Sequence, residues 1–186
     1  MKNLLDIFLC SILVIVLLVP MLFIGISVRL SSKGPAIYWS ERVGKDCIIF
    51  KMPKFRTMKL ETPQLATHLM KDPNFFYTPI GRFLRKYSLD ELPQIFSIFK
   101  GDMSLVGPRP ALFNQENLIN LRQSKGINAI KPGITGLAQV NGRDEITIPI
   151  KVSYDEEYLN NLSLKTDIFI LWLTVLKVLR REDVSH

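Results

Sequence analysis

A run of 22 consecutive uncharged residues, from Ile7 to Val28, constrains this chain more than any other feature. As an α-helix the run would measure about 33 Å, against a bilayer hydrocarbon core of about 30 Å. A cleaved signal peptide is the alternative, with Gly25-Ile26-Ser27 as a small-residue cleavage site. The apolar region of a signal peptide is usually about 7–15 residues long, so the longer run favours a segment that stays in the membrane.

Pro20 bears on how this segment meets the membrane. A proline inside a helix removes a hydrogen bond and kinks the axis. Thirteen uncharged residues precede Pro20 and eight follow it, and neither piece alone crosses about 30 Å. Lys2 and Arg29 flank the two ends alike, so the positive-inside rule does not choose between a straight span and a re-entrant helix. We expect residues 1–30 to form a re-entrant helix with Pro20 as its break.

Composition limits what the rest of the chain can be. Hydrophobic residues make up 47% of the 186 residues, which excludes a disordered chain. Two cysteines and two histidines exclude a disulfide scaffold and disfavour a histidine-built metal site. The net charge of +7 predicts a polyanionic partner: nucleic acid, anionic lipid or a phosphorylated substrate. We expect residues 31–186 to form one compact domain.

The apolar periodicity predicts an α+β fold that is mostly helical, with one small β-hairpin. Helix 79–87 has an apolar stripe beside basic residues, which suits either a membrane interface or an ordinary core contact. The predicted hairpin strands contain residues 36–39 and 47–50, a short strand covers 137–140, and the other helices cover 88–100, 111–124, 149–160 and 163–181.

Two acidic residues, Asp90 and Glu91, lie near the start of helix 88–100. Ser88 and Glu91 match a capping box, which would give the pair a purely structural task. Pro93 argues instead that the helix begins one turn later, because a proline at that position leaves a first-turn carbonyl unpaired. The pair would then lie just before the positive end of the helix, where a carboxylate suits a nucleophile or a metal ligand.

Basic side chains gather in several segments. Residues 42–59 contain six of them, which form either a solvated or membrane-facing surface or part of a substrate site. Arg109 stands between Pro108 and Pro110, and a stiffened guanidinium suits bidentate binding of a phosphate. The turn at Asn141-Gly142 displays a further arginine, Arg143.

Four long motifs occur in order, at residues 54–58, 88–94, 100–110 and 131–143. Together they resemble the bacterial sugar transferases, specifically the monotopic polyprenyl-phosphate hexose-1-phosphate transferases, over almost the whole chain. The motifs read Lys54-Phe55-Arg56-Thr57-Met58, Ser88-Leu89-Asp90-Glu91-Leu92-Pro93-Gln94, Lys100-Gly101-Asp102-Met103-Ser104-Leu105-Val106-Gly107-Pro108-Arg109-Pro110 and Lys131-Pro132-Gly133-Ile134-Thr135-Gly136-Leu137-Ala138-Gln139-Val140-Asn141-Gly142-Arg143.

The resemblance implies a reaction and its partners. A sugar 1-phosphate would pass from a UDP-sugar to undecaprenyl phosphate, with release of UMP and through a covalent phosphosugar on Asp90. Glu91 would help to hold Mg²⁺, the implied cofactor. The partners would be these two substrates and membrane lipid, with no nucleic acid. The protein would lie at the bacterial plasma membrane, with its catalytic domain on the cytoplasmic face.

The resemblance also gives the basic residues roles. Arg109 and Arg143 are the first candidates for phosphate binding, and Lys54 and Arg56 are weaker ones. Asp155 matches an acid that the family carries in its penultimate helix, and a substrate-site role and a structural salt bridge both stay open.

The chain departs from the family at the bend of the membrane helix, and two other functions stay open. The smallest members of the sugar transferase family tend to have Ser-Pro at the bend of the membrane helix, whereas this chain has Val19-Pro20. A membrane-tethered adaptor that binds polyanions would also explain the net charge. A nucleotide-sugar hydrolase would share the fold and release sugar phosphate without any lipid acceptor.

Overall fold

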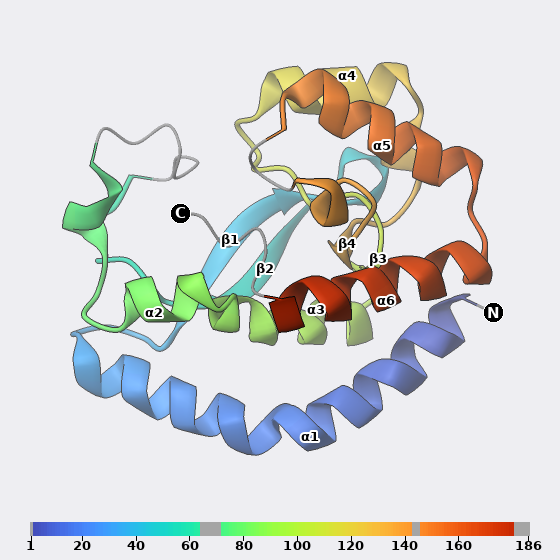
Figure 1. Ribbon diagram of the computed structural model, residues 1–186. Coiled ribbons are helices and arrows are strands. Elements are labelled where there is room, and N and C mark those ends of the chain that lie inside the picture. The colour runs from blue at the N-terminus through green and yellow to red at the C-terminus, as the bar shows by residue number, and fades with distance from the viewer. Residues whose placement is uncertain (1, 64–71, 143–145, 181–186) are drawn as a thin grey trace.

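The computed structural model describes residues 2–63, 72–142 and 146–180 of the chain. Figure 1 shows helices above and below a small central β-structure, with the long N-terminal helix as the lowest element. The α-helices are α1 (Lys2–Ser31), α2 (Gly81–Lys86), α3 (Ile95–Phe99), α4 (Glu116–Ser124), α5 (Ile148–Asn160) and α6 (Leu164–Arg180). The strands are β1 (Ile37–Val43), β2 (Ile49–Phe55), β3 (Ser104–Val106) and β4 (Gly133–Thr135). The 3₁₀ helices are η1 (Lys45–Cys47), η3 (Pro73–Phe76), η4 (Leu89–Gln94), η5 (Ile127–Ala129) and η6 (Gln139–Asn141). The α+β class is confirmed.

The hairpin is confirmed and is longer than predicted. Strands β1 and β2 pair antiparallel from Ile37 opposite Phe55 to Val43 opposite Ile49. Gly44 begins the turn, and its amide donates a hydrogen bond to the Ile48 carbonyl. In this register Lys54 lies on the last part of β2, close to the 3₁₀ helix η4.

The strand predicted over residues 137–140 is wrong. The chain forms its strand earlier, at β4, which pairs in parallel with β3. Residues 139–141 form the 3₁₀ helix η6 instead. Leu137 and Val140 both pack against the main hydrophobic core, and residues three apart share a face in a 3₁₀ turn, whereas in a strand they would point to opposite faces.

The main hydrophobic core joins the central β-structure to the helices around it. It joins residues from α1, α3, the hairpin, β3, α5 and α6. Cys10 of α1 and Ile170 of α6 are both fully buried in this cluster. A second cluster joins Val28 of α1, Phe55 and Leu84. The N-terminal helix therefore packs into the same body as the rest of the chain.

Helix α1 is continuous through Pro20, so the predicted break is not present as an interruption. It is bowed rather than straight in Figure 1. Its N-terminal arm meets the body through Lys2, which pairs with Asp167 at 2.6 Å, and through Asp6, which accepts a hydrogen bond from Ser104 at 2.7 Å. Its other end meets the body at the buried Val28. By length and hydropathy α1 is the one helix among the described residues able to cross a membrane.

Helix α2 begins at Gly81, two residues later than Thr78-Pro79 predicts. The Thr78 hydroxyl does not cap the helix but donates to the Thr57 carbonyl at 3.2 Å. The Gly81 amide donates to the Thr78 carbonyl, and a Cβ at position 81 would collide with the Thr57 carbonyl. Close contact between the start of α2 and the segment after β2 therefore sets the beginning of the helix.

Candidate functional site

The acidic pair lies in the 3₁₀ helix η4, directly before α3. Ser88 has a left-handed backbone (φ 51°), and its side chain makes no capping hydrogen bond to the described residues that follow it. Helix α3 begins at Ile95, beyond Pro93. The capping-box interpretation is therefore wrong, and the later helix start, which Pro93 indicated, is confirmed.

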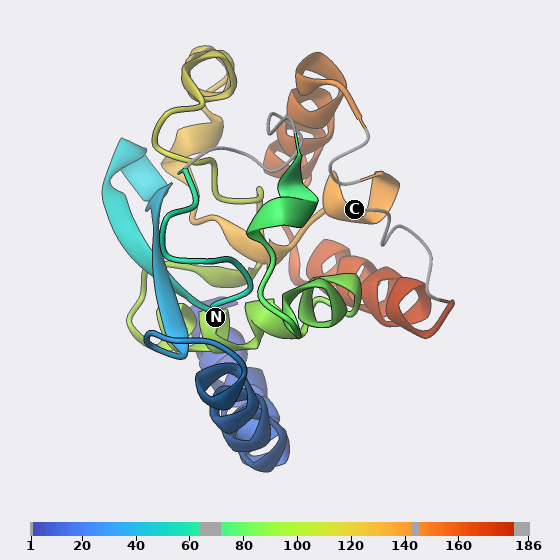
Figure 2. The ribbon, with the colours of Figure 1, turned by 90° about the vertical axis from the view of Figure 1, so that its left-hand side faces the viewer.

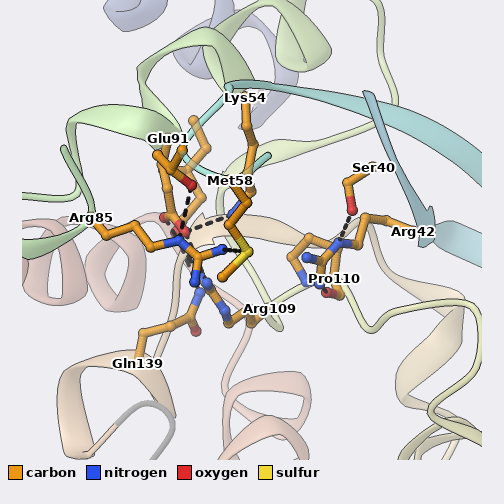
Figure 3. A network of polar contacts seen from close by, with 11 residues as sticks. Ser40, Arg42, Lys54, Met58, Arg85, Glu91, Arg109, Pro110 and Gln139 are labelled. Carbon is orange, nitrogen blue, oxygen red and sulfur yellow. Dashed lines mark hydrogen bonds and ion pairs between the residues drawn. The ribbon is translucent and has the colours of Figure 1, made fainter. Parts of the chain in front are cut away.

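Glu91 is the centre of a compact ion cluster. Its Oε1 accepts hydrogen bonds from Lys54 Nζ at 2.9 Å and from Arg109 Nη2 at 2.8 Å. A longer contact of 3.5 Å joins Arg109 Nη1 to Oε2. Figure 3 shows the three side chains converging from β2, η4 and the turn after β3. Three segments far apart in the sequence thus meet at one carboxylate.

The charge of Lys54 depends on the acidic pair. Burial lowers the pKa of Lys54 below its usual value, while the carboxylates of Glu91 and Asp90 act in the opposite direction. The nearby guanidinium groups of Arg109 and Arg42 lower this pKa further. Both carboxylates are therefore close enough to Lys54 to interact with its charge, and Asp90, which is only 6% exposed, belongs to the cluster.

Arg85 is a member of this region that the sequence analysis did not single out. Its Nε donates to Thr57 Oγ1 at 3.0 Å, and its guanidinium lies over the Tyr77 ring. Figure 3 shows Arg85 beside Glu91 and Arg109. The basic face predicted for helix 79–87 was the available signal, but spacing alone did not show which of its basic residues would point to the acidic pair.

Arg56 does not join the cluster. Its side chain is buried, and its three nitrogens donate to the backbone carbonyls of Ser32, Lys33 and Pro35 at 2.7–3.0 Å. These carbonyls belong to the connection between α1 and β1. The guanidinium therefore holds this connection against β2, and the contacts do not support the expected binding of a phosphate.

Asp155 also lies apart from the acidic pair. It is 2% exposed, and its Oδ2 accepts from Nη2 and Nε of the buried Arg122, at 2.6 and 2.9 Å. Burial raises the pKa of Asp155, and Arg122 opposes that shift. Of the two roles left open for Asp155, the geometry supports the salt bridge. Arg143 lies outside the described residues.

Asp90 and Glu91 are the carboxylates that would hold the implied magnesium ion. Among the described residues, no group of three or more His, Cys, Asp or Glu side chains gathers as a metal site. Mg²⁺, however, commonly uses only one or two carboxylates together with substrate phosphates. Asp90 and Glu91 supply two carboxylates of this kind next to Lys54 and Arg109.

These features define a class of protein. Asp90 is buried and Glu91 half-buried, and a pair of carboxylates faced by two cations suits chemistry on an anion. The membrane-length helix α1 packs against α3, which follows the pair directly. The sequence profile described as bacterial sugar transferase matches residues 1–181, and the chain belongs to this family.

Several curated relatives are similar to the chain. An undecaprenyl-phosphate galactose phosphotransferase of Salmonella typhimurium is 37% identical over 93% of this chain and 39% of its own length. A UDP-glucose:undecaprenyl-phosphate glucose-1-phosphate transferase of Escherichia coli is 41% identical over 89% of this chain and 37% of its own length. An uncharacterized sugar transferase, EpsL, of Bacillus subtilis is 41% identical over 86% of this chain and 77% of its own length. The chain thus spans about two fifths of the first two relatives.

Proposed function

We propose that this protein transfers a sugar 1-phosphate from a UDP-sugar to undecaprenyl phosphate, with release of UMP. The observation that carries the proposal is the cluster of Asp90, Glu91, Lys54 and Arg109, which combines a carboxylate nucleophile with groups that bind phosphate. Relatives named for this reaction or for a closely similar one support the choice of substrates.

The reaction would proceed in two displacements. A carboxylate oxygen of Asp90 attacks the phosphorus that bears the sugar, the bond from that phosphorus to the bridging oxygen breaks, and UMP leaves. The product is a phosphosugar bound to the Asp90 carboxylate, which stays reactive enough to be passed on. A phosphate oxygen of undecaprenyl phosphate then attacks the same phosphorus and releases the Asp90 carboxylate. The soluble donor and the lipid acceptor thus use one site in turn.

The cations of the cluster would bind the donor. Arg109 is 21% exposed at its side chain and Lys54 14%, so Arg109 is the more accessible of the two to a diphosphate. Glu91 orients both head groups, and a guanidinium pairs with phosphate oxygens through two parallel hydrogen bonds. Mg²⁺, held by Glu91 and the diphosphate oxygens, would offset negative charge on the donor.

The membrane arrangement is part of the proposal. Helix α1 would enter and leave the same face of the bilayer, because both of its ends contact the body, through Lys2 and Asp6 on one side and Val28 on the other. Figures 1 and 2 both show α1 as the lowest layer of the molecule, with α2, α3 and α6 nearby above it. Exposed apolar side chains of α6 would meet the membrane interface beside it, at Ile168, Phe169, Trp172, Val175 and Val178. The site would face the cytoplasm, which holds UDP-sugars.

Turnover of a panel of UDP-sugars tests the proposal. Full-length protein in detergent is mixed with Mg²⁺, undecaprenyl phosphate and each donor, and UMP is measured. We expect Asp90→Asn to lower turnover by about 10³-fold or more and to leave no radiolabelled phosphosugar on the protein, because its amide is not a nucleophile. Asp46→Asn is the matched control, since Asp46 is exposed on the hairpin turn and Asn tolerates its positive φ.

The same assay separates the alternatives. Sugar phosphate released in many turnovers without the lipid would favour a nucleotide-sugar hydrolase. A protein that releases no UMP from any donor would favour the membrane-tethered adaptor. Near-normal turnover by Asp90→Asn would contradict the covalent route while keeping the transferase.

A further inference from the structure

The turn that carries Arg109 is held along its whole backbone. Four consecutive carbonyls, from Pro108 to Ala111, each accept a hydrogen bond from outside the turn, and the donors lie in β1, α4 and β4. The donors are Gly133 N to Pro108 at 2.9 Å, Arg122 Nη1 to Arg109 at 2.8 Å, Arg42 Nη1 to Pro110 at 3.1 Å and Val43 N to Ala111 at 2.9 Å. The two middle donors are side chains, and they bind the carbonyls of Arg109, whose guanidinium binds Glu91, and of the next residue, Pro110.

Arg122 points one guanidinium nitrogen at this turn. It comes from α4 and is 4% exposed. Asp155 of α5 takes its Nε and Nη2, which leaves Nη1 for the Arg109 carbonyl. A buried ion pair contributes little net stability, because desolvation of the two charges offsets their attraction. A role in fixing geometry therefore accounts for the Asp155–Arg122 pair better than a role in stability.

Arg42 performs a similar task from the hairpin. Its Nε donates to the hydroxyl of the buried Ser40 at 3.0 Å, and its Nη1 donates to the Pro110 carbonyl. Figure 3 shows Arg42 reaching Pro110 on the side of the turn away from Glu91. The turn is thus held from the hairpin and from α4, while its own arginine points into the acidic cluster.

We propose that Arg122, oriented by Asp155, and Arg42 are positioning residues that fix Arg109 for the diphosphate of the donor. The inference deepens the proposed function and rests on it. Neither residue needs to touch the donor, since each acts through a backbone carbonyl at or beside Arg109. Loss of either contact should allow Arg109 to shift, and small misplacements of a binding group reduce its effect strongly.

A double-mutant cycle with UDP as the probe tests the inference. UDP affinity is measured on full-length wild type, Arg109→Ala, Arg122→Lys and the double variant. Lysine keeps a positive partner for Asp155, but its single head group cannot reproduce three fixed contacts. We expect Arg122→Lys to weaken UDP binding about tenfold, and to add almost nothing in the Arg109→Ala background, because residues that act together are not additive.

The control is Lys125→Gln, which removes an exposed ion pair between the same two helices, Lys125 with Glu156 at 3.0 Å. It should leave UDP affinity unchanged. The inference is overturned if Arg122→Lys lowers the melting temperature but keeps UDP affinity, or if its effect is as large without Arg109 as with it. If Arg122→Lys does not fold, Arg42→Lys runs the same cycle through the Pro110 carbonyl. Absence of UDP binding by the wild type would instead contradict the proposed function.

Discussion

The charges of Lys54 and Glu91 compensate one another in an ion pair, which matters because both side chains are largely buried. Burial holds the pKa of Lys54 below its usual value, so the unfolded chain binds more protons at Lys54 than the folded chain between the two pKa values. Stability therefore rises with pH across that window. Glu91→Gln removes the carboxylate charge that raises the pKa of Lys54 most. The folded-state pKa then falls further, and the pH range between the two pKa values extends to lower pH.

We therefore expect Glu91→Gln to be destabilised by about 3 kcal/mol near neutral pH. The loss should shrink as the pH rises toward about 10.4, the ordinary lysine pKa, because the unfolded chain then also begins to release the proton of Lys54. Melting temperatures of the variant and the wild type between pH 7 and 10 measure this. Glu156→Gln, which breaks the exposed pair with Lys125, should change stability by less than about 1 kcal/mol. A loss for Glu91→Gln that does not vary with pH would contradict the interpretation of Lys54.

Arg56 and Arg109 should respond to substitution in opposite ways. Arg56→Lys loses hydrogen bonds to three carbonyls, so we expect a loss of about 2–4 kcal/mol in stability with unchanged UDP affinity. Arg109→Lys should weaken UDP binding about tenfold or more with little change in melting temperature, since its guanidinium is partly exposed. If Arg56→Lys instead weakens UDP binding and keeps the melting temperature, Arg56 is a phosphate-binding residue after all.

The same two arginines show what the sequence can predict about the site. Both lie in motifs of the family, and the proximity of Arg109 to the acidic pair follows the expectation from those motifs. The carbonyls that occupy Arg56 lie 21 to 24 residues earlier, in the connection after α1. Nothing in the local pattern of residues 54–58 indicates that long-range contact. The contacts of Arg85 were hidden for the same reason.

Among the elements, the N-terminal arm of α1 docks partly through a buried polar contact. Asp6 and Ser104 are both buried and share a 2.7 Å hydrogen bond. Asp6 lies four residues before the fully buried Cys10 in the same helix. Asp6→Ala leaves the Ser104 hydroxyl without this acceptor, at a cost of about 1.5–3 kcal/mol for a charged partner. We expect the N-terminal arm of α1 to open more often in that variant.

Cys10 reports the opening directly. In detergent-solubilised protein, Asp6→Ala should speed the labelling of Cys10 by a small maleimide about tenfold, with the half-buried Cys47 as the internal reference. Ser11→Ala is the control, because Ser11 donates only to the carbonyl of Ile7 within the same helix. Equal labelling of Cys10 in all three proteins would show that the Asp6 contact does not hold the arm.

Elements with strong local patterns were predicted well, and those made by distant contacts were not. The hairpin and the helices near α4, α5 and α6 follow from β-rich runs and apolar periodicity. The β3–β4 pair has three residues in each strand, too few for a pattern to appear. It forms because Gly107 and Gly133 allow their backbones to approach closely, where a Cβ on either residue would collide with the other segment.

At the scale of the whole molecule, the contacts at the two ends of α1 bear on its membrane topology. A straight span would carry Lys2 to the opposite face of the bilayer, yet Lys2 pairs with Asp167 of α6 at 2.6 Å. The Tyr158 hydroxyl donates to the other oxygen of Asp167, so this partner is itself fixed within the body. The uninterrupted helix at Pro20 shows that a bowed helix, rather than a true break, would serve a re-entrant arrangement.

A single cysteine tests this topology in intact cells. Asn3→Cys is made in a variant in which Cys10 and Cys47 are replaced by alanine, and an impermeant maleimide is added outside. If α1 is re-entrant, position 3 lies inside with the body and should label at less than about a tenth of the level reached after the cells are permeabilised. Residue 3 is exposed in the fold, so burial does not explain protection. Equal labelling before and after permeabilisation would show a true span, in which Lys2 and Asp167 separate while the cluster at Glu91 remains as it is.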